Sequence, residues 1–232
     1  MNQAGVDKQE LYNKDYFEGG LKTEKPPYSW DSKKYYFKVI VDTLQHLKPK
    51  KLLDIGCAKG FLVSMLSANG LEAYGVDISS YAIQSAPDYV KDKLFIVDIE
   101  KERLPFENSY FDLVTGLEVL EHLLSLDNIL RELNRVLIKD GYVFFTTPTP
   151  GSWDAKHDLT HVNIHSRIYW IELFSKYGFL EAEKETQRIF RKEIIKNYKH
   201  NVNLIPPVRK IGKFLLDLGW LGKILRREMQ VY

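Results

Sequence analysis

Two segments of the sequence combine histidines with acidic residues that could take a proton from a hydroxyl group. The first is Glu118–His122 (EVLEH), and the second is Asp154–Ser166, which holds three more histidines. An imidazole accepts protons near neutral pH, and a neighbouring carboxylate can hold the ring in the required orientation. His161 is the first candidate for the base and His122 the second, and Asp158 could orient an imidazole. For each of these histidines, a solvated loop position is the alternative.

A glycine-rich corner, Gly56–Gly60 (GCAKG), stands between a short apolar run and a segment with helical spacing. Glycines let the backbone approach a ligand closely, and the free N–H groups at a helix start favour an anionic group. A nicotinamide dinucleotide is the alternative ligand, but its pyrophosphate would need the spacing G-x-G-x-x-G. Three residues separate the glycines here, and this spacing suits an amino-acid carboxylate better.

Acidic residues stand at the ends of three successive strand-like runs, at Asp54, Asp77 and Asp98. Asp77 is placed to accept hydrogen bonds from both hydroxyls of a ribose. Asp98 could receive an adenine amino group, with Ile78 and Ile99 packing on the faces of the ring. A single acid in such a position is often a turn former, but three in succession after a glycine corner predict a site for an adenosyl amino acid.

The elements that must position these residues alternate along the chain. Strands are expected at 51–55, 72–77, 94–99, 111–117, 142–147 and 179–186, the last paired near 188–192, and helices at 31–47, 61–68, 79–87, 126–137 and 166–177. Strands that alternate with helices predict a parallel sheet with helices on both faces. Ligands bind such sheets beyond the carboxyl ends of the strands, and the candidate residues fall there.

This arrangement resembles the class I S-adenosylmethionine-dependent methyltransferases, in particular the ubiquinone- and sugar-modifying enzymes. The matching segments lie within about residues 50–150 and read LLDIGCAKGFLV, AYGVDIS, FIVDIE, LPFENSYFDLVTGLEVLEHL and LNRVLIKDGYVFFTTPTP. The resemblance implies S-adenosylmethionine as the cofactor and S-adenosylhomocysteine as its product. It also implies an α/β fold with a Rossmann-like, doubly wound, seven-stranded and mainly parallel sheet whose last strand is antiparallel.

The resemblance further implies which residues hold the cofactor. Gly56, Cys57 and Gly60 are expected near the methionine end, with Asp54 and Ala58 in the same segment. Asp77 is assigned to the ribose, Asp98 with Ile78 and Ile99 to the adenine, and Leu117, Glu118 and Val119 to the flank of the cofactor at the fourth strand. Ala58 stands where many relatives have glycine. An alanine is tolerated there if its φ is negative.

The Glu118–His122 segment, taken with a later histidine, also resembles the metal-binding pattern of small-RNA 2′-O-methyltransferases. Two carboxylates and imidazoles could hold a divalent ion that activates a ribose hydroxyl. The pattern also occurs in metal-free relatives, and no RNA-binding domain is evident in the sequence, so no metal is predicted. A cofactor-binding regulatory protein that keeps the fold without the chemistry is the hypothesis from a different class.

The two ends of the chain are expected to lie outside the main domain of residues 31–192. Residues 1–30 are polar and aromatic and are predicted to be an irregular arm that closes over the cofactor as a lid. Tyr16, Tyr28, Trp30 and His165 are the candidates for lining the acceptor pocket. Residues 193–232 are predicted to be a basic amphipathic helical tail, which could pack on its own domain, on a twin subunit or on an anionic membrane surface.

The composition limits the classes of partner. The 232 residues carry a formal net charge of +2, which is too small to indicate a nucleic-acid partner. The single cysteine excludes an internal disulfide and a cysteine-rich zinc site, and the polar N-terminus has no signal core, so a cytoplasmic protein is expected. We therefore predict a monomeric or homodimeric enzyme that O-methylates a small molecule or a sugar or glycan precursor.

Overall fold

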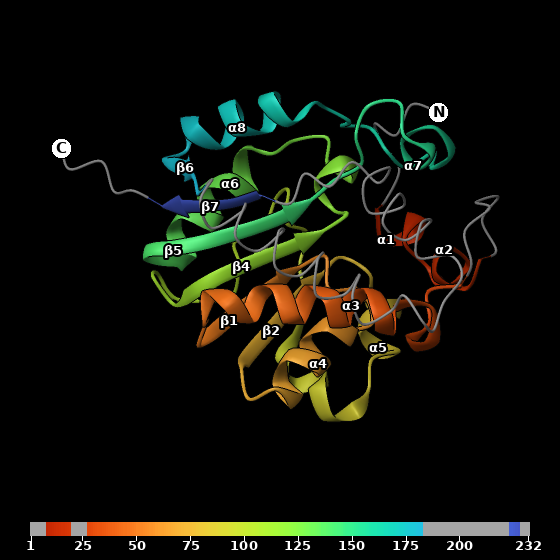
Figure 1. The fold of residues 1–232 in the computed structure, drawn as a ribbon. Helices are drawn as coiled ribbons and strands as arrows, with labels where there is room; N and C mark the ends of the chain where they lie inside the picture. The colour runs from red at the N-terminus through yellow and green to blue at the C-terminus, as the bar shows by residue number, and fades with distance from the viewer. Residues whose placement is uncertain (1–7, 20–26, 183–222, 228–232) are drawn as a thin grey trace, which may run out of the picture.

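A computed structural model describes residues 8–19, 27–182 and 223–227, and a single sheet forms its centre (Figure 1). The strand order is β3-β2-β1-β4-β5-β7-β6. The parallel strands are β1 (Lys51–Ile55), β2 (Glu72–Asp77), β3 (Leu94–Ile96), β4 (Phe111–Leu117) and β5 (Leu137–Thr146). Their carboxyl ends share one edge of the sheet, as the alternation of strands and helices predicts. The predicted α/β class is confirmed, and five strands of the sheet are parallel.

The other side of β5 carries two further strands, β6 (Phe179–Glu181) and β7 (Lys223–Arg227). β7 runs antiparallel to both β5 and β6. The helical prediction is wrong at 223–227, because these residues form β7. The strand from Phe179 pairs with β7 on one side, and the partner predicted for it near 188–192 falls outside the described residues. The free backbone groups along the edge of β5 need hydrogen-bond partners, and a strand supplies them where a helix cannot. Residues 188–192 and the rest of the tail lie outside the described residues.

Helices cover both faces of the sheet. Their bounds are α3 (Trp30–Leu44), followed by a 3-10 turn over Gln45–Leu47, then α4 (Phe61–Ala68), α5 (Ser80–Gln84), α6 (Asp127–Val136) and α8 (Arg167–Lys176). Side chains of α3, α4 and α5 share one buried cluster, whereas those of α6 and α8 share the other. None of the helices that the structure describes is long and apolar enough to cross a membrane.

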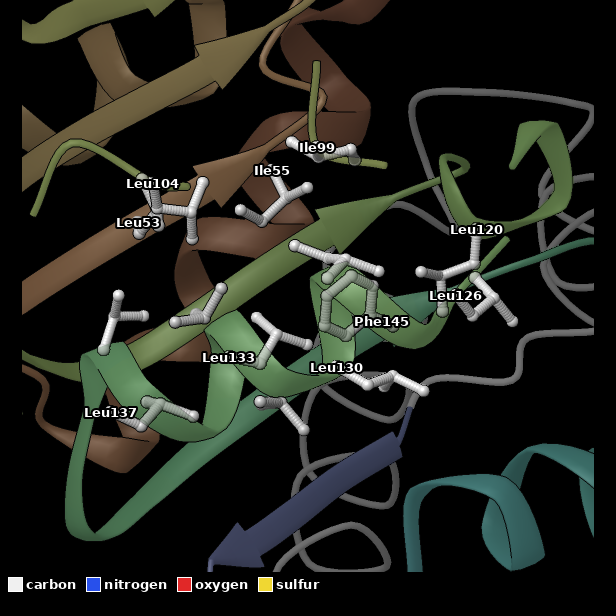
Figure 2. Close-up of a cluster of buried hydrophobic side chains, with 14 of the residues drawn as sticks. Leu53, Ile55, Ile99, Leu104, Leu120, Leu126, Leu130, Leu133, Leu137 and Phe145 are labelled. Atoms are coloured by element: carbon white, nitrogen blue, oxygen red, sulfur yellow. The ribbon is translucent and has the colours of Figure 1, made fainter. Parts of the chain in front are cut away.

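α6 shows how the sequence spacing produces this packing. Ile129, Leu130, Leu133 and Val136 are buried because they recur at helical spacing along one face. Figure 2 shows Leu130 and Leu133 in one cluster with Leu53 of β1. Full burial of a leucine contributes about 1.5–3 kcal/mol, so this helix fixes the sheet firmly behind the site.

The N-terminal arm forms two short helices, α1 (Lys8–Leu11) and α2 (Lys14–Glu18), where an irregular segment was expected. Asn13 caps the start of α2, and Gly19 ends it in the left-handed region. The arm lies beyond the tips of β4 and β5 (Figure 1). The Ser79 hydroxyl donates to the carbonyl oxygen of Tyr12, which attaches the arm to the carboxyl edge of the sheet. A further short helix, α7 (Trp153–His157), occurs in the segment expected to be a loop.

Close packing at the end of β4 leads to the first testable prediction. A Cβ atom at Gly116 would lie 2.1 Å from Phe145 Cε1 and 2.9 Å from Val119 Cγ1. We expect Gly116→Ala to lower the free energy of unfolding by about 2 kcal/mol, because an extra methyl group in a filled core forces its neighbours to move. Urea unfolding followed by circular dichroism would measure this change.

Gly70→Ala is the matched control for Gly116→Ala. Gly70 has a φ of 83°, but a Cβ there meets no atom within 4 Å. Its replacement is therefore expected to cost only the backbone strain, about 1 kcal/mol. Equal losses in the two variants would contradict the packing explanation.

Candidate active site

The glycine corner after β1 has the geometry of a ligand-binding turn. Gly56 has a φ of 69°, and Gly60, the N-cap of α4, has a φ of 65°. A Cβ atom at Gly56 would lie 2.8 Å from Val119 Cγ2. Both the positive φ and the close approach require glycine at this position. Glycine at position 56 therefore lets the corner turn tightly against Val119.

Ala58 departs from its expected conformation. Its φ is 49°, in the left-handed region, so the condition under which alanine is easily tolerated here, a negative φ, is not met. The reason is tertiary, because the Ala58 N–H donates to Asp77 Oδ2 at 2.8 Å. Holding an alanine in this region costs about 1 kcal/mol, which the hydrogen bond to a buried carboxylate can offset.

Asp77 links the corner to the end of β2. Its other oxygen accepts from the Ser79 N–H at 2.8 Å, and the side chain is almost fully buried. Burial raises the pKa of this carboxyl group, and the backbone donors oppose that rise. Each carboxylate oxygen has two lone pairs, so Asp77 keeps acceptor capacity for ligand hydroxyls.

Asp98 lies close to Asp77, at the same edge of the sheet. The Val97 N–H donates to the Asp77 carbonyl oxygen at 2.9 Å, which brings the segment after β3 against the end of β2. Asp98 Oδ1 accepts from the Glu100 N–H at 3.1 Å, and Oδ2 forms an ion pair with Lys101 at 2.8 Å. The expected meeting of the glycine corner, Asp77 and Asp98 at one edge is confirmed.

Two residues that the resemblance assigns to the cofactor point into the protein. Asp54 is 4% exposed, and its Oδ1 accepts from the Thr115 hydroxyl at 2.9 Å. The Cys57 side chain is 2% exposed and packs where Gly75 leaves no Cβ. Burial raises the pKa of Asp54 to about 7 and raises that of the Cys57 thiol. Only the backbone of Cys57 is in a position to face a ligand at the corner.

The remaining assigned residues lie close to the edge. Ile78 is half-buried beside Asp77, and Ile99 is 8% exposed. Leu117 ends β4, and Glu118 follows it with a φ of 55°. The Glu118 N–H donates to the Thr146 carbonyl oxygen at 3.0 Å. A glutamate held in this strained region is typical of functional sites.

The two histidine segments meet beyond β4 and β5. His122 belongs to a 3-10 turn, Leu120–His122, and His161 comes from the loop after β5. Val162 and Asn163 fix that loop by donating their N–H groups to the Glu121 carbonyl oxygen at 2.8 and 2.9 Å. The imidazole centroids of His122 and His161 lie 4.7 Å apart. The expected juxtaposition of the segments is confirmed.

Two carboxylates surround the His161 ring. Its Nε2 lies 3.5 Å from Asp158 Oδ2 and 4.0 Å from Glu121 Oε1, and both acidic side chains are fully buried. Burial and these carboxylates raise the pKa values of Tyr12 and Tyr16 above the ordinary value for tyrosine. Two buried acidic side chains at this edge, when ionised, favour a cationic group beside them.

Three residues of this cluster could also hold a metal ion. One ligand atom each from Glu121, His122 and His161 lies within 4.8 Å of the others. A carboxylate with two imidazoles suits zinc and the divalent transition metals. Glu118 is not in this group among the residues that the structure describes, so the pattern noted in the sequence is assembled only in part.

The four residues predicted to line an acceptor site lie in different places. Tyr16 lies beside the histidine cluster, where its ring centroid is 4.9 Å from that of Tyr12 and burial and Asp158 raise its pKa. Tyr28 stacks on Phe61 at 5.6 Å, near the glycine corner, and Trp30 packs on the same ring while remaining 41% exposed. His165 stacks on Tyr169 of α8 at 3.7 Å.

Two residues of the cluster were not identified from the sequence. The Tyr12 ring lies 5.9 Å from His122 and 4.9 Å from Tyr16, edge to face in both cases. Tyr12 and Tyr16 are four positions apart in an aromatic segment, and this spacing could have identified Tyr12 as a partner of Tyr16. Thr160 hydrogen-bonds with both His122 and Asp158. A threonine in a polar loop has no pattern that would mark it.

Comparisons with known proteins agree with the architecture. A family model described as a methyltransferase domain matches residues 31–203. An S-adenosylmethionine-dependent methyltransferase structure from Archaeoglobus fulgidus superposes with a TM-score of 0.55 at 17% identity, covering 87% of this chain and 100% of that one. A Haemonchus contortus phosphoethanolamine N-methyltransferase 2 structure gives 0.59 at 16% identity, covering 97% and 60%. At these identities, the likeness concerns the fold.

Curated relatives match over about half of the chain. The chain is 32% identical over 137 residues to a malonyl-[acyl-carrier protein] O-methyltransferase of Legionella pneumophila, covering 53% of this chain and 48% of the relative. It is 32% identical over 105 residues to a ubiquinone biosynthesis O-methyltransferase of Nitrosomonas europaea, covering 44% and 45%. The chain thus spans about half the length of these relatives. The family match and the sheet order together show that the chain belongs to the methyltransferase-domain family, with the fold of the class I S-adenosylmethionine-dependent methyltransferases.

Proposed function

We propose that this protein transfers a methyl group from S-adenosylmethionine to a hydroxyl group of a small molecule or of a sugar or glycan precursor. The observation that carries the proposal is the buried cluster of His122, His161 and two carboxylates at the sheet edge that also holds the glycine corner. A neutral hydroxyl is a poor nucleophile, so its methylation needs a base, and the cluster supplies imidazoles at this edge.

The residues at the edge fit the proposed cofactor. The corner around Gly56 and Gly60 would receive the methionine end, Asp77 the ribose hydroxyls, and Asp98 with Ile99 the adenine. When bound, S-adenosylmethionine supplies a methyl group already activated by its sulfonium. The protein must therefore mainly hold the acceptor in line with that methyl group and exclude water.

The names of the curated relatives support oxygen as the acceptor atom. The relatives from Legionella pneumophila and Nitrosomonas europaea are both named as O-methyltransferases. Because the match spans about half of each relative, their substrates are not carried over to this chain. We propose only the chemical class of the acceptor, a small molecule that presents a hydroxyl group.

The arrangement of the whole chain is also a proposal. Residues 1–30 would serve as the lid, residues 31–192 together with β7 as the catalytic domain, and the rest of residues 193–232 as a tail that contacts a subunit or membrane surface. The short arm helices, which place Tyr12 and Tyr16 against the histidine cluster, support the lid. The single, buried Cys57 fits a cytoplasmic protein.

Calorimetry followed by turnover tests this function. Titration with S-adenosylmethionine should give saturable binding at one site per chain. Formation of S-adenosylhomocysteine should then depend on an added acceptor from a panel of phenols, catechols, sugars and nucleotide sugars, with amines of matched size as the comparison. Turnover only with amines would overturn the O-methylation proposal. Binding without turnover across the panel would favour a cofactor-binding regulatory protein.

A metal-dependent form of the same reaction is the second candidate. It is favoured by the Glu121, His122 and His161 atoms that lie within 4.8 Å of one another. These residues would hold a divalent ion that lowers the pKa of an acceptor hydroxyl bound to it. Metal analysis of the purified protein, with turnover before and after treatment with a chelator, distinguishes the two candidates. One equivalent of metal whose removal abolishes turnover would favour the metal-dependent form.

A further inference from the structure

The hydroxyl oxygen of Tyr12 is buried, and its hydrogen-bonding capacity is unused. Among the residues that the structure describes, none forms a hydrogen bond with this oxygen, and almost none of its surface is accessible to solvent. A buried hydroxyl that makes no hydrogen bond costs free energy, so such a group in a folded protein needs an explanation. A ligand that pairs with the hydroxyl on binding is an explanation if the group is held in place next to a site.

Contacts of the N-terminal arm hold Tyr12 in place. Its N–H donates to the Lys8 carbonyl oxygen at 3.0 Å, and its own carbonyl oxygen accepts from the Ser79 hydroxyl. Lys8 in turn forms an ion pair with Glu100 in the loop after β3, and its ammonium group donates to the His122 carbonyl oxygen at 3.3 Å. The backbone of Tyr12 is therefore attached to the carboxyl edge of the sheet, and the unpaired hydroxyl does not belong to a loose segment.

The Tyr12 side chain lies at the histidine cluster, on the side of the proposed ribose site. Its ring contacts that of His122 edge to face, with 5.9 Å between the centroids. Burial raises the pKa of Tyr12, and the carboxylates that raise it further are, in decreasing order, those of Asp158, Asp77, Glu121 and Glu100. Asp158 of the cluster thus acts on the hydroxyl more strongly than Asp77 of the ribose site. The hydroxyl keeps its proton and belongs to the cluster side of the edge.

We propose that Tyr12 binds the acceptor by donating a hydrogen bond to its reacting oxygen, and that this bond favours oxygen over nitrogen acceptors. This inference rests on the proposed function and adds a specificity residue to it. A hydroxyl oxygen has two lone pairs, so one can accept from Tyr12 while the other attacks the methyl carbon. Its own proton stays available to the imidazoles of the cluster. A neutral amine has one lone pair, which the attack uses, so it cannot accept from Tyr12 at the same time.

The proposed step conserves atoms and charge, and Tyr12 keeps its own proton throughout. The acceptor oxygen forms a bond to the methyl carbon, and the electron pair of the broken carbon–sulfur bond stays on sulfur. The proton of the acceptor moves to an imidazole of the histidine cluster. One positive charge is lost at the sulfonium and one appears on the imidazole. The hydrogen bond from Tyr12 holds the oxygen in line with the methyl group and stabilises the negative charge that develops as the proton leaves.

Kinetics of Tyr12→Phe test the hydrogen bond, because the variant removes the hydroxyl and keeps the ring that contacts His122. We expect kcat/KM for a hydroxyl acceptor to fall by about tenfold to a hundredfold, as for the loss of one hydrogen bond to an atom that gains charge. The affinity for S-adenosylmethionine, measured by calorimetry, should change by less than about threefold. Turnover of an amine of matched size should also change little. An equal loss with both acceptors would assign Tyr12 a merely structural role and overturn the inference.

Thermal unfolding of the ligand-free protein tests the unpaired hydroxyl without reference to activity. Tyr12→Phe removes a buried group that makes no hydrogen bond, so the Tm should rise by about 2–4 °C. Tyr177→Phe is the matched control, because the Tyr177 hydroxyl donates to Asp127 Oδ1 at 2.6 Å beside α8. This control should lower the Tm and leave kcat/KM unchanged. A Tm that falls in Tyr12→Phe as it does in Tyr177→Phe would show that the Tyr12 hydroxyl is already paired in the free protein, and would overturn the inference.

The outcomes separate this inference from the proposed function. Turnover of the wild-type protein with hydroxyl acceptors decides the proposed function, and the comparison of wild type with Tyr12→Phe decides the inference. If the wild type methylates a hydroxyl acceptor and Tyr12→Phe is equally fast, the role of Tyr12 fails and O-methylation stands. If the wild type methylates only amines, both proposals fail. A loss of affinity for S-adenosylmethionine of tenfold or more in Tyr12→Phe would assign the hydroxyl to the cofactor and overturn its assignment to the acceptor.

Discussion

Replacing Asp77 by alanine is expected to weaken the binding of S-adenosylmethionine by roughly 10²–10⁴-fold. The proposed site gives this carboxylate two ribose hydroxyls, and each hydrogen bond to a charged group contributes about 1.5–3 kcal/mol. Asp77 also accepts the N–H groups of Ala58 and Ser79, so the variant loosens the corner that receives the methionine end. Isothermal titration calorimetry with S-adenosylmethionine and S-adenosylhomocysteine measures both ligands, which should be affected alike because they share the ribose.

Two further variants accompany this experiment: Asp77→Asn as the conservative replacement and Asp88→Asn as the surface control. The amide introduced by Asp77→Asn keeps one acceptor oxygen. The affinity of this variant for S-adenosylmethionine should therefore lie between those of the wild type and the alanine variant. Asp88 is exposed and forms an ion pair with Lys91 on the surface, so its replacement should leave binding unchanged. If Asp77→Ala changes the affinity by less than about threefold while circular dichroism shows a folded protein, the ribose site has been assigned to the wrong residue.

Asp54 is expected to make the protein less stable as the pH rises from about 4 to 7. Burial raises the pKa of this carboxyl group from 3.8 to about 7, and the Thr115 hydroxyl that donates to it offsets only part of the rise. The folded protein therefore binds the proton more tightly than the unfolded chain does. Its stabilising contribution is complete below about pH 4 and is lost as the pH passes through the folded-state pKa. The difference amounts to at most about 4 kcal/mol.

Asp54→Asn removes this titration and keeps an oxygen that can accept from Thr115. We expect the free energy of unfolding of the variant to change less between pH 4 and 7 than that of wild type. The variant should also gain in stability relative to wild type as the pH rises. Urea unfolding at intervals of half a pH unit measures both curves, and groups that titrate in both proteins cancel in the difference. Parallel curves would mean that Asp54 titrates near its ordinary pKa in the folded protein.

The sequence alone determined the elements whose limits are set by local geometry. Helix α4 and strands β2 and β4 have the expected bounds, because the spacing of apolar residues and the flanking glycines reflect local geometry. The meeting of the corner, Asp77 and Asp98 also followed from the sequence. Parallel strands joined by right-handed crossovers place their carboxyl ends at one edge, wherever the side chains point.

Only the tertiary structure decided the features that depend on partners distant in the chain. The left-handed φ of Ala58 is set by its bond to Asp77, and the strand at 223–227 by the edge of β5. The contact between His122 Nδ1 and the Thr160 hydroxyl joins residues 38 positions apart, and Thr160 has no distinguishing pattern in the sequence. Local propensities of about 1 kcal/mol or less favour a conformation weakly, so one buried hydrogen bond or a free sheet edge is enough to override them.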